Sequence, residues 1–332
     1  MGFTPTTTTL ALGAAVLSLV ALVLVLVLLR SRASTPRQGA NHSSASADPV
    51  ARAEEITQPL PFASRTAPTD SPSVRLRAAQ RTDRGQVRSH NEDDTLIMDL
   101  QNEDGQVRSA LYAIADGVGG AQKGEVASRT AIESVIQALR SDPFFTDGEY
   151  LKGGADEQVV IEVLRNAVLS ANREVYSVRV NQNVDMGTTM VLALVMGSTA
   201  YVANVGDSRA YLLRDEEIRQ ITQDHSLVER MVTSGQITRA EARLHPRRNL
   251  IFRSLGADPH VEVDLFVETL KPGDRLLLCS DGLSGPVSDD ALLHLSSREP
   301  NVDRACRSMI EAANQAGGTD NISVVLAEVV AS

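Results

Sequence analysis

The chain has 332 residues, 42% of them hydrophobic, and a formal net charge of −10. Five Arg and four acidic residues in 1–74 leave residues 75–332 with 27 basic and 38 acidic groups, a net charge of −11. A domain this acidic argues against binding nucleic acid or anionic lipid, because both are polyanions. The two cysteines, Cys279 and Cys306, belong to no Cys/His cluster, which argues against a zinc site and fits a reducing compartment.

The first recognisable element is an apolar run at residues 10–29, LALGAAVLSLVALVLVLVLL, which contains no charged side chain. As a helix rising ~1.5 Å per residue it would cross the ~30 Å hydrocarbon core of a bilayer. A cleavable signal peptide is the alternative, but residues 1–9 are a short tail without a basic side chain, and Arg30, Arg32 and Arg37 follow the run. We therefore expect a retained single transmembrane helix in the cell membrane, with its C-terminal side in the cytoplasm.

Residues 30–74 are rich in Ser, Ala, Pro and Thr and show no apolar periodicity, which predicts a flexible linker ahead of a domain at 75–332. Within that domain, amphipathic periodicity predicts helices at 124–140 and 157–178. Apolar and β-branched runs predict strands at 110–115, 188–195, 199–205, 209–213, 276–279 and 322–330. Several of these strands follow one another through Gly-containing turns without a helix between them. This favours an α+β fold with antiparallel sheets over a doubly wound one.

Acidic residues recur at the ends of the predicted strands. Asp116, Asp207 and Asp281 each end an apolar run, and Asp320 stands just before another. A single Asp-Gly pair usually marks a turn. Repetition, together with Glu92 and Asp93, instead indicates a set of carboxylates without His or Cys, which suits magnesium or manganese.

Arg88 lies four residues before Glu92, in the stretch VRSHNEDD. It could form a surface ion pair with Glu92, or its planar guanidinium could hold two oxygens of a phosphate group. Carboxylates for metal ions and an Arg for phosphate are what hydrolysis of a phosphate ester requires, because bound divalent ions bring the pKa of water down toward ~7. Motifs for a cysteinyl-phosphate, an aspartyl-phosphate and a nucleotide-binding P-loop are absent from the sequence.

Seven stretches, taken together and in order, resemble the metal-dependent phosphatases of the protein phosphatase 2C family. They are TDRGQVRSHNEDD, AIADGVGGAQKGEVAS, DMGTTM, VANVGDSRAYLLRD, DHSLVERMVTSGQIT, LLLCSDGLSGPVSDD and GGTDNISVV. The resemblance covers nearly all of residues 77–330. It implies an α-β-β-α sandwich, in which two antiparallel sheets are flanked by helices, with a binuclear Mn/Mg site at one end.

The resemblance also implies roles for single residues. Asp116 would bridge the two metal ions and the Gly117 carbonyl would bind one of them, while Asp281 and Asp320 would ligate the other. Arg88 would bind the substrate phosphate.

Further positions match the family less directly. Glu92 and Asp93 match acids at the edge of the site, acting directly or through water, and Asp185 matches the acid that bacterial members use for a third metal ion. Asp207 and Asn321 are expected to support turns and the hydrogen bonds behind the ligands.

The chain departs from the family at two positions. Val118 stands where eukaryotic members have a His that protonates the leaving group, so no general acid is assigned. Within the segment that corresponds to the family's flap, residues 224–249, Leu244 stands where some bacterial members have Ser.

The sequence thus predicts a membrane-anchored serine/threonine phosphoprotein phosphatase that hydrolyses phosphoesters through a metal-bridging hydroxide. By resemblance, its substrates are phosphoserine and phosphothreonine proteins, including Ser/Thr protein kinases and their targets. A pseudophosphatase is disfavoured because all three principal metal acids are present, and a metal-dependent nuclease is disfavoured by the net charge of −11. A switch dedicated to one phosphoprotein stays open, because sequence does not separate it from a broad phosphatase.

Overall fold

The computed structural model describes residues 74–101, 107–119, 123–148 and 155–331. All of them belong to the second of two compact units, Ala63–Ser332. The predicted tail at 1–9 and transmembrane helix at 10–29 lie outside the described residues, as does the predicted linker except for Val74, which begins the first strand. In the part of the chain that the structure describes, no helix is long and apolar enough to cross a membrane.

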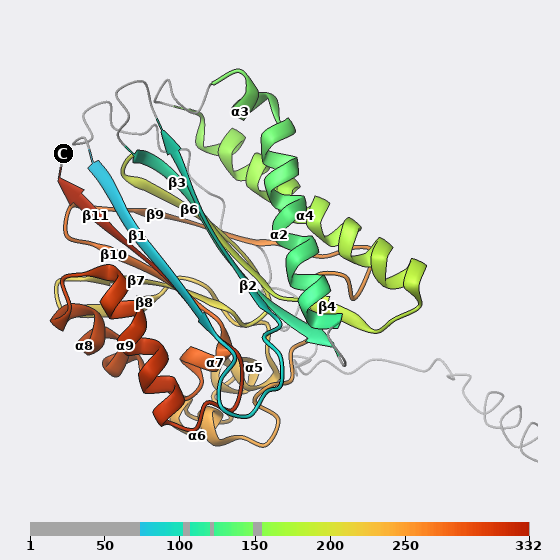
Figure 1. Cartoon of the computed structure of the whole chain (residues 1–332), viewed down its shortest axis with the longest axis vertical. Helices are drawn as coiled ribbons and strands as arrows, with labels where there is room; N and C mark the ends of the chain where they lie inside the picture. Colours follow the sequence, from blue (N-terminus) through green and yellow to red (C-terminus); the bar gives the residue numbers. More distant parts are fainter. Residues whose placement is uncertain (1–73, 102–106, 120–122, 149–154, 332) are drawn as a thin grey trace, which may run out of the picture. The chain divides into compact units, whose positions relative to one another are not determined.

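Two antiparallel sheets form the centre of the domain (Figure 1). The strands of the first sheet, in spatial order, are β1 (Val74–Asp83), β11 (Ile322–Ala331), β10 (Arg275–Cys279), β7 (Arg209–Arg214) and β8 (Glu217–Gln220). Those of the second are β2 (Asp93–Gln101), β3 (Val107–Gly119), β5 (Met190–Met196), β6 (Thr199–Val205) and β9 (Asp264–Thr269), with β4 (Met186–Thr188) paired to the end of β3.

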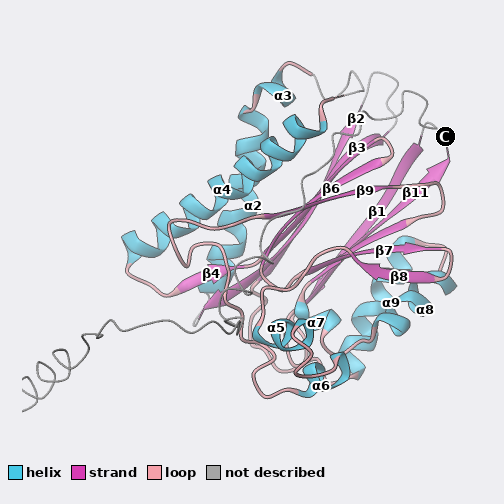
Figure 2. Cartoon of the chain, turned by 180° about the vertical axis from the view of Figure 1, so that it is seen from behind, coloured by secondary structure: helices cyan, strands magenta, loops and turns pink. Residues whose placement is uncertain are grey.

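Helices cover the outer face of each sheet (Figure 2). The second sheet carries α2 (Lys123–Ser141) and α4 (Glu157–Gln182), with the short α3 (Pro143–Thr146) between them in the chain, and the first carries α8 (Asp289–Arg298) and α9 (Val302–Gln315). The short helices α5 (Leu227–Thr233), α6 (Arg239–Leu244) and α7 (Asp281–Ser284) gather at one end of the sheets (Figure 1).

The alternation of side chains along β3 shows why two layers of core form. Ala110, Tyr112 and Ile114 belong to the apolar cluster between the sheets, whereas Leu111 and Ala113 belong to the cluster under α2 and α4. A strand buried on both faces reads as a continuous apolar run, because its side chains alternate between two cores. The predicted α-β-β-α sandwich is thereby confirmed.

The predicted elements agree with the structure in kind and differ in their bounds. The helices predicted at 124–140 and 157–178 are α2 and the longer α4, which continues to a left-handed C-cap at Asn183. The single strand predicted at 188–195 is two strands, β4 and β5, separated at Thr189. The Thr189 N–H leaves the ladder and donates to the Asp116 carbonyl at 2.8 Å. The break lies at the end of the second sheet at which the acidic residues gather.

Candidate metal centre

The acids predicted from the strand ends converge at one end of the sandwich. Asp93 and Asp116 face each other in the register of β2 and β3. Asp281 follows β10 as the first residue of α7, and Asp320 stands two residues before β11, the antiparallel neighbour of β10. Antiparallel pairing brings the end of one strand beside the start of the next, so residues far apart in the chain meet here.

These carboxyl groups alter one another's protonation. The pKa of Asp116 lies well above its usual range, because the group is desolvated and because Asp93 and Asp281 add negative charge nearby, although its side chain keeps an edge exposed to solvent. Desolvation and the charge of Asp320 likewise raise the pKa of Asp281, which shares a hydrogen bond with Asp116. Carboxylates gathered this closely repel each other unless a proton or a cation lies between them.

Asp93 lies deeper in the cluster than the edge position expected from the sequence. Its side chain is 8% exposed, and burial raises its pKa. One oxygen, Oδ2, accepts a hydrogen bond from Ser280 Oγ at 2.9 Å, but the buried Oδ1 has no hydrogen-bond partner. A buried oxygen without a partner costs free energy, and its usual remedy is an ion or an ordered water.

Glycines let the backbone approach the acids closely. A Cβ atom on Gly117 would lie 2.2 Å from the Gly124 carbonyl oxygen and 2.5 Å from that of Glu92. Gly117 N–H donates to the same Glu92 oxygen at 3.1 Å. Glu92 accepts a hydrogen bond from the Gly124 backbone, near the start of α2, while burial raises its pKa. The β3–α2 turn therefore packs onto Glu92.

The residues present fit divalent ions bound through few protein ligands. Within the described ranges, no group of three or more His, Cys, Asp or Glu side chains is already arranged around a single ion position. Magnesium and manganese keep several waters and need only one or two carboxylates each. Asp116, Asp281, Asp320 and the Gly117 carbonyl, with the partnerless Asp93 oxygen behind them, provide that donor set.

Arg88 contacts Asp320 rather than Glu92. Its Nη2 donates to Asp320 Oδ2 at 2.8 Å, and this hydrogen bond raises the pKa of the Arg88 guanidinium. The ion pair between Arg88 and Glu92, which was one of two interpretations of the sequence, is therefore not formed. The Arg88 side chain is 47% exposed and remains open to an incoming anion.

Asn321 holds the loop that carries Arg88. Its Oδ1 accepts from Glu92 N–H at 2.8 Å, and its Nδ2 donates to the carbonyl oxygens of Arg84 and His90, each at 2.9 Å. These bonds agree with the supporting role expected of Asn321. They also place the loop at 84–92 directly against Asp320.

Asp207 belongs to the acid cluster, which its expected supporting role did not anticipate. It is 7% exposed, and burial raises its pKa well above the usual range, with the charge of Asp281 as the next cause. The available signal was its position at the end of an apolar strand, shared with Asp116 and Asp281. Asp185 does not join the cluster: its side chain is 97% exposed and pairs with Arg179 at 3.1 Å.

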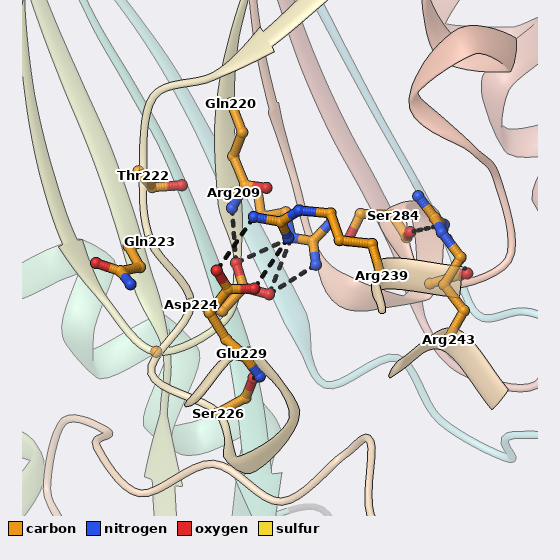
Figure 3. A network of polar contacts seen from close by, with 12 residues as sticks. Arg209, Gln220, Thr222, Gln223, Asp224, Ser226, Glu229, Arg239, Arg243 and Ser284 are labelled. Carbon is orange, nitrogen blue, oxygen red and sulfur yellow. Dashed lines mark hydrogen bonds and ion pairs between the residues drawn. The ribbon is translucent and has the colours of Figure 1, made fainter. Parts of the chain in front are cut away.

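A pocket of about 470 Å³ extends from the acids to the flap. Its lining includes the acids Asp207, Asp281 and Asp320 and, from the flap, Arg239, Arg243 and Arg248. Its wall contains a buried ion pair, in which Arg209 Nε and Nη2 donate to Asp224 (Figure 3). The cation of Arg209 also lowers the pKa values of Asp207 and Asp281, against the larger effect of burial. The arrangement can hold cations at the acids and an anionic group or peptide beside them.

The comparisons with known proteins agree with this geometry. The family model described as Protein phosphatase 2C matches residues 83–327. The chain is 38% identical to a serine/threonine phosphatase stp of Listeria monocytogenes over 253 residues, which is 76% of this chain and 96% of that protein. It is also 38% identical to the serine/threonine protein phosphatase PstP of Mycobacterium tuberculosis over 258 residues, 77% of this chain and 45% of that protein.

Solved structures show the same relationship. The catalytic domain of PstP in complex with two manganese ions superimposes with a TM-score of 0.65 at 38% identity, covering 78% of this chain and all of that one. The serine/threonine phosphatase Stp1 from Staphylococcus aureus superimposes with a TM-score of 0.68 at 34% identity, covering 78% of this chain and 97% of that one.

Proposed function

The chain belongs to the protein phosphatase 2C family of metal-dependent serine/threonine protein phosphatases, and from that premise we propose how its own residues perform the reaction and where in the cell they do so. The observation that carries the proposal is the meeting of Asp116, Asp281 and Asp320 at one end of the sandwich, with Arg88 bonded to Asp320. Acids for two divalent ions thus lie beside a cation for the phosphate.

Asp116, the Gly117 carbonyl, Asp281 and Asp320 would together hold the two divalent ions. Manganese or magnesium bound there would supply a hydroxide nucleophile at neutral pH, because divalent ions lower the pKa of bound water toward ~7. Asp93 and Glu92 act through water at the back and the edge of the set. Asp185 stays outside it, paired with Arg179, so the proposal requires no third ion.

Arg88 orients the substrate. Its guanidinium presents a planar set of N–H donors that match two oxygens of a phosphate group. Because the side chain already contacts Asp320, a phosphate held by Arg88 lies next to the metal ligands. Proximity of this kind turns a bimolecular attack into a local one. No side-chain acid is assigned to the leaving group, since Val118 follows Asp116-Gly117.

The proposal extends to location and partners. The uncharged run at 10–29 followed by Arg30, Arg32 and Arg37 supports a single membrane anchor with the catalytic domain in the cytoplasm. An anchor of this kind raises the local concentration of the phosphatase near membrane-bound phosphoproteins, including Ser/Thr kinases. Membrane fractionation of the full chain against a deletion of residues 1–29 tests this: a full chain that stays in the soluble fraction would remove the anchor from the proposal.

The catalytic proposal is tested with the full chain on a phosphothreonine peptide. We expect turnover that depends on Mn²⁺, stops with EDTA, and falls about 100-fold in Asp281→Asn, which keeps the shape of the side chain but removes a charged ligand. Asp303→Asn is the matched control, because Asp303, in the first turn of α9, is a partly exposed acid that pairs with Arg81 and does not line the pocket. Full activity of Asp281→Asn would show that the metal assignment is wrong.

A further inference from the structure

One arginine of the flap is bonded to the short helix that carries Asp281. Arg243, in the last turn of α6, donates from Nη1 to the carbonyl oxygens of Ser284 at 2.8 Å, Gly285 at 3.1 Å and Val287 at 3.1 Å. Its Nη2 donates to Asp289 Oδ1 at 3.1 Å. Figure 3 shows the guanidinium pointing at Ser284, away from the Arg209–Asp224 pair.

These carbonyls need an external donor. The last carbonyls of any helix lack partners within the helix, and α7 has only four residues. Ser284 is 3% exposed, so water has little access to it. A guanidinium can serve several oxygens at once through its planar set of donors, and its charge also complements the negative end of the helix. Arg243 therefore defines where the C-terminal end of α7 lies.

The other end of α7 is the metal acid itself. A Cβ on Gly282 would lie 1.9 Å from the Asn321 carbonyl oxygen, so the first turn is packed tightly against the residue that follows Asp320. Leu283 is fully buried in the core under α9. α7 is a single turn about 6 Å long, so its Arg243 end and Asp281 are one turn apart. A shift at its Arg243 end therefore moves the Asp281 carboxylate as well.

We propose that Arg243 is a positioning residue for the metal centre, which couples the flap to Asp281 and keeps that carboxylate in place for the divalent ions. The inference rests on the proposed role of Asp281 as a metal ligand. It assigns to a flap residue a function in metal binding, although Arg243 is itself a cation and touches no acid of the cluster.

The direction of the change in Mn²⁺ affinity distinguishes a positioning role of Arg243 from a purely electrostatic one. Arg243 and Arg239 both lie on α6 and both line the pocket that contains the acids. By Coulomb's law alone, removal of either cation strengthens the binding of Mn²⁺. Positioning predicts the opposite for Arg243 only, because Arg239 bonds to Glu229 of α5 at 2.9 and 3.1 Å and not to α7.

The experiment measures Mn²⁺ binding to the full chain by the electron paramagnetic resonance signal of free Mn²⁺. We expect Arg243→Ala to raise the apparent Kd by about ten-fold, the range seen when groups that orient metal ligands are removed. Arg239→Ala should bind Mn²⁺ as tightly as the wild type or more tightly. In phosphopeptide assays, Arg243→Ala should need a correspondingly higher Mn²⁺ concentration for half-maximal activity and should recover kcat when Mn²⁺ is saturating.

Asp281→Asn distinguishes a failure of the metal assignment from a failure of the coupling between Arg243 and Asp281. If Asp281→Asn binds Mn²⁺ like the wild type, the metal assignment fails. If Asp281→Asn loses an ion while folded Arg243→Ala binds Mn²⁺ with unchanged or improved affinity, the coupling alone is wrong. Should Arg243→Ala not fold, Arg243→Lys decides the matter: it keeps the charge but not the planar set of donors, and we expect its Kd to rise about three-fold, with no rise overturning the proposal.

Discussion

Arg88 and Asp320 are 232 residues apart in the chain, yet Arg88 Nη2 lies 2.8 Å from Asp320 Oδ2. One belongs to the loop after β1 and the other to the turn before β11, which is the antiparallel neighbour of β1. The contact joins the proposed phosphate ligand to a proposed metal ligand. Removal of Arg88 therefore affects the phosphate directly and the metal only through a neighbouring charge.

Replacement of Arg88 by Ala should raise KM for a phosphopeptide about ten-fold, because a charged hydrogen bond to the phosphate is lost from a half-exposed position. The Kd for Mn²⁺ should stay the same or fall, since Asp320 is freed from a competing cation. Steady-state kinetics at saturating Mn²⁺ and a metal titration measure the two effects.

Arg84→Ala is the control for that prediction. Arg84 lies in the same loop, and among the described residues its guanidinium reaches the Ser89 carbonyl, at 3.5 Å, and no acid of the cluster. The KM of the Arg84→Ala variant for the phosphopeptide should match that of the wild type. A weakened Mn²⁺ affinity in Arg88→Ala, with KM unchanged, would rule out the phosphate role.

Asn321→Ala should destabilise the fold by about 3 kcal/mol, because the side chain is 5% exposed and makes three hydrogen bonds to the backbone of the loop at 84–92, each worth about 1 kcal/mol. KM should rise in parallel, since the loop at 84–92 carries Arg88. Urea unfolding and phosphopeptide kinetics measure these changes. Asn321→Asp keeps the acceptor for Glu92 N–H and should retain part of the stability; equal stability of the alanine variant and the wild type would contradict the anchoring role.

Gly282→Ala should cost more than 3 kcal/mol or prevent folding, because its Cβ would lie 1.9 Å from the Asn321 carbonyl oxygen, a rigid backbone atom. Gly197→Ala is a comparison at an open position with φ 55°, where only the backbone strain of about 1 kcal/mol is expected. Thermal unfolding of both variants compares the two costs. A Gly282→Ala protein with the wild-type Tm would show that α7 can move away from Asn321.

His225, near the start of the flap, contacts a carboxylate of β9 whose pKa is lowered. His225 Nδ1 accepts from Gly206 N–H at 2.9 Å, and its Nε2 lies 3.1 Å from Asp264 Oδ2 and 2.9 Å from Arg253 Nη1. Burial raises the pKa of Asp264, but the hydrogen bond with His225 and the positive charge of Arg253, whose Nη1 lies 2.8 Å from Asp264 Oδ1, outweigh it, and the net shift is downward.

A lowered folded-state pKa means that Asp264 contributes stability above its unfolded pKa of about 4, and that this contribution is lost as the pH falls through the folded value. Asp264→Asn should therefore be less stable than the wild type at pH 7, by roughly 1 kcal/mol or less because the group is partly screened. The gap should close below pH 4. Urea unfolding between pH 7 and pH 3 measures it; a gap that widens toward low pH would contradict the assignment.

Much of the fold and part of the site follow from local patterns. The periods of α2 and α4 and the apolar runs of β5, β6, β10 and β11 are visible because burial on one stripe or on two faces constrains residue type directly. The acids Asp116, Asp281 and Asp320 are visible because each stands where such a run ends or begins. The family resemblance converts those positions into proposed metal ligands.

Other features depend on distances that no local pattern contains. Asp207 stands at a strand end like Asp116, but only the packing of the two sheets shows that it is buried beside Asp281. Arg88 faces Asp320 and not Glu92, because the loop at 84–92 is held by Asn321, a residue more than 200 positions later. In the sequence, Arg243 looks like any other helix residue. Its hydrogen bonds to the end of α7 become visible only in the tertiary structure.

The sequence by itself therefore determined the class of fold, the residue types available for metal and phosphate, and the apolar run at its N-terminal end. These depend on side-chain chemistry and on periodicity along a single element. The tertiary structure alone decided which acids lie in one site and which cation pairs with each of them. It also decided which carbonyl oxygens accept hydrogen bonds from Arg243 of the flap. Those relationships are set by antiparallel register and by sheet packing, which join residues through space at separations that the order of residues leaves open.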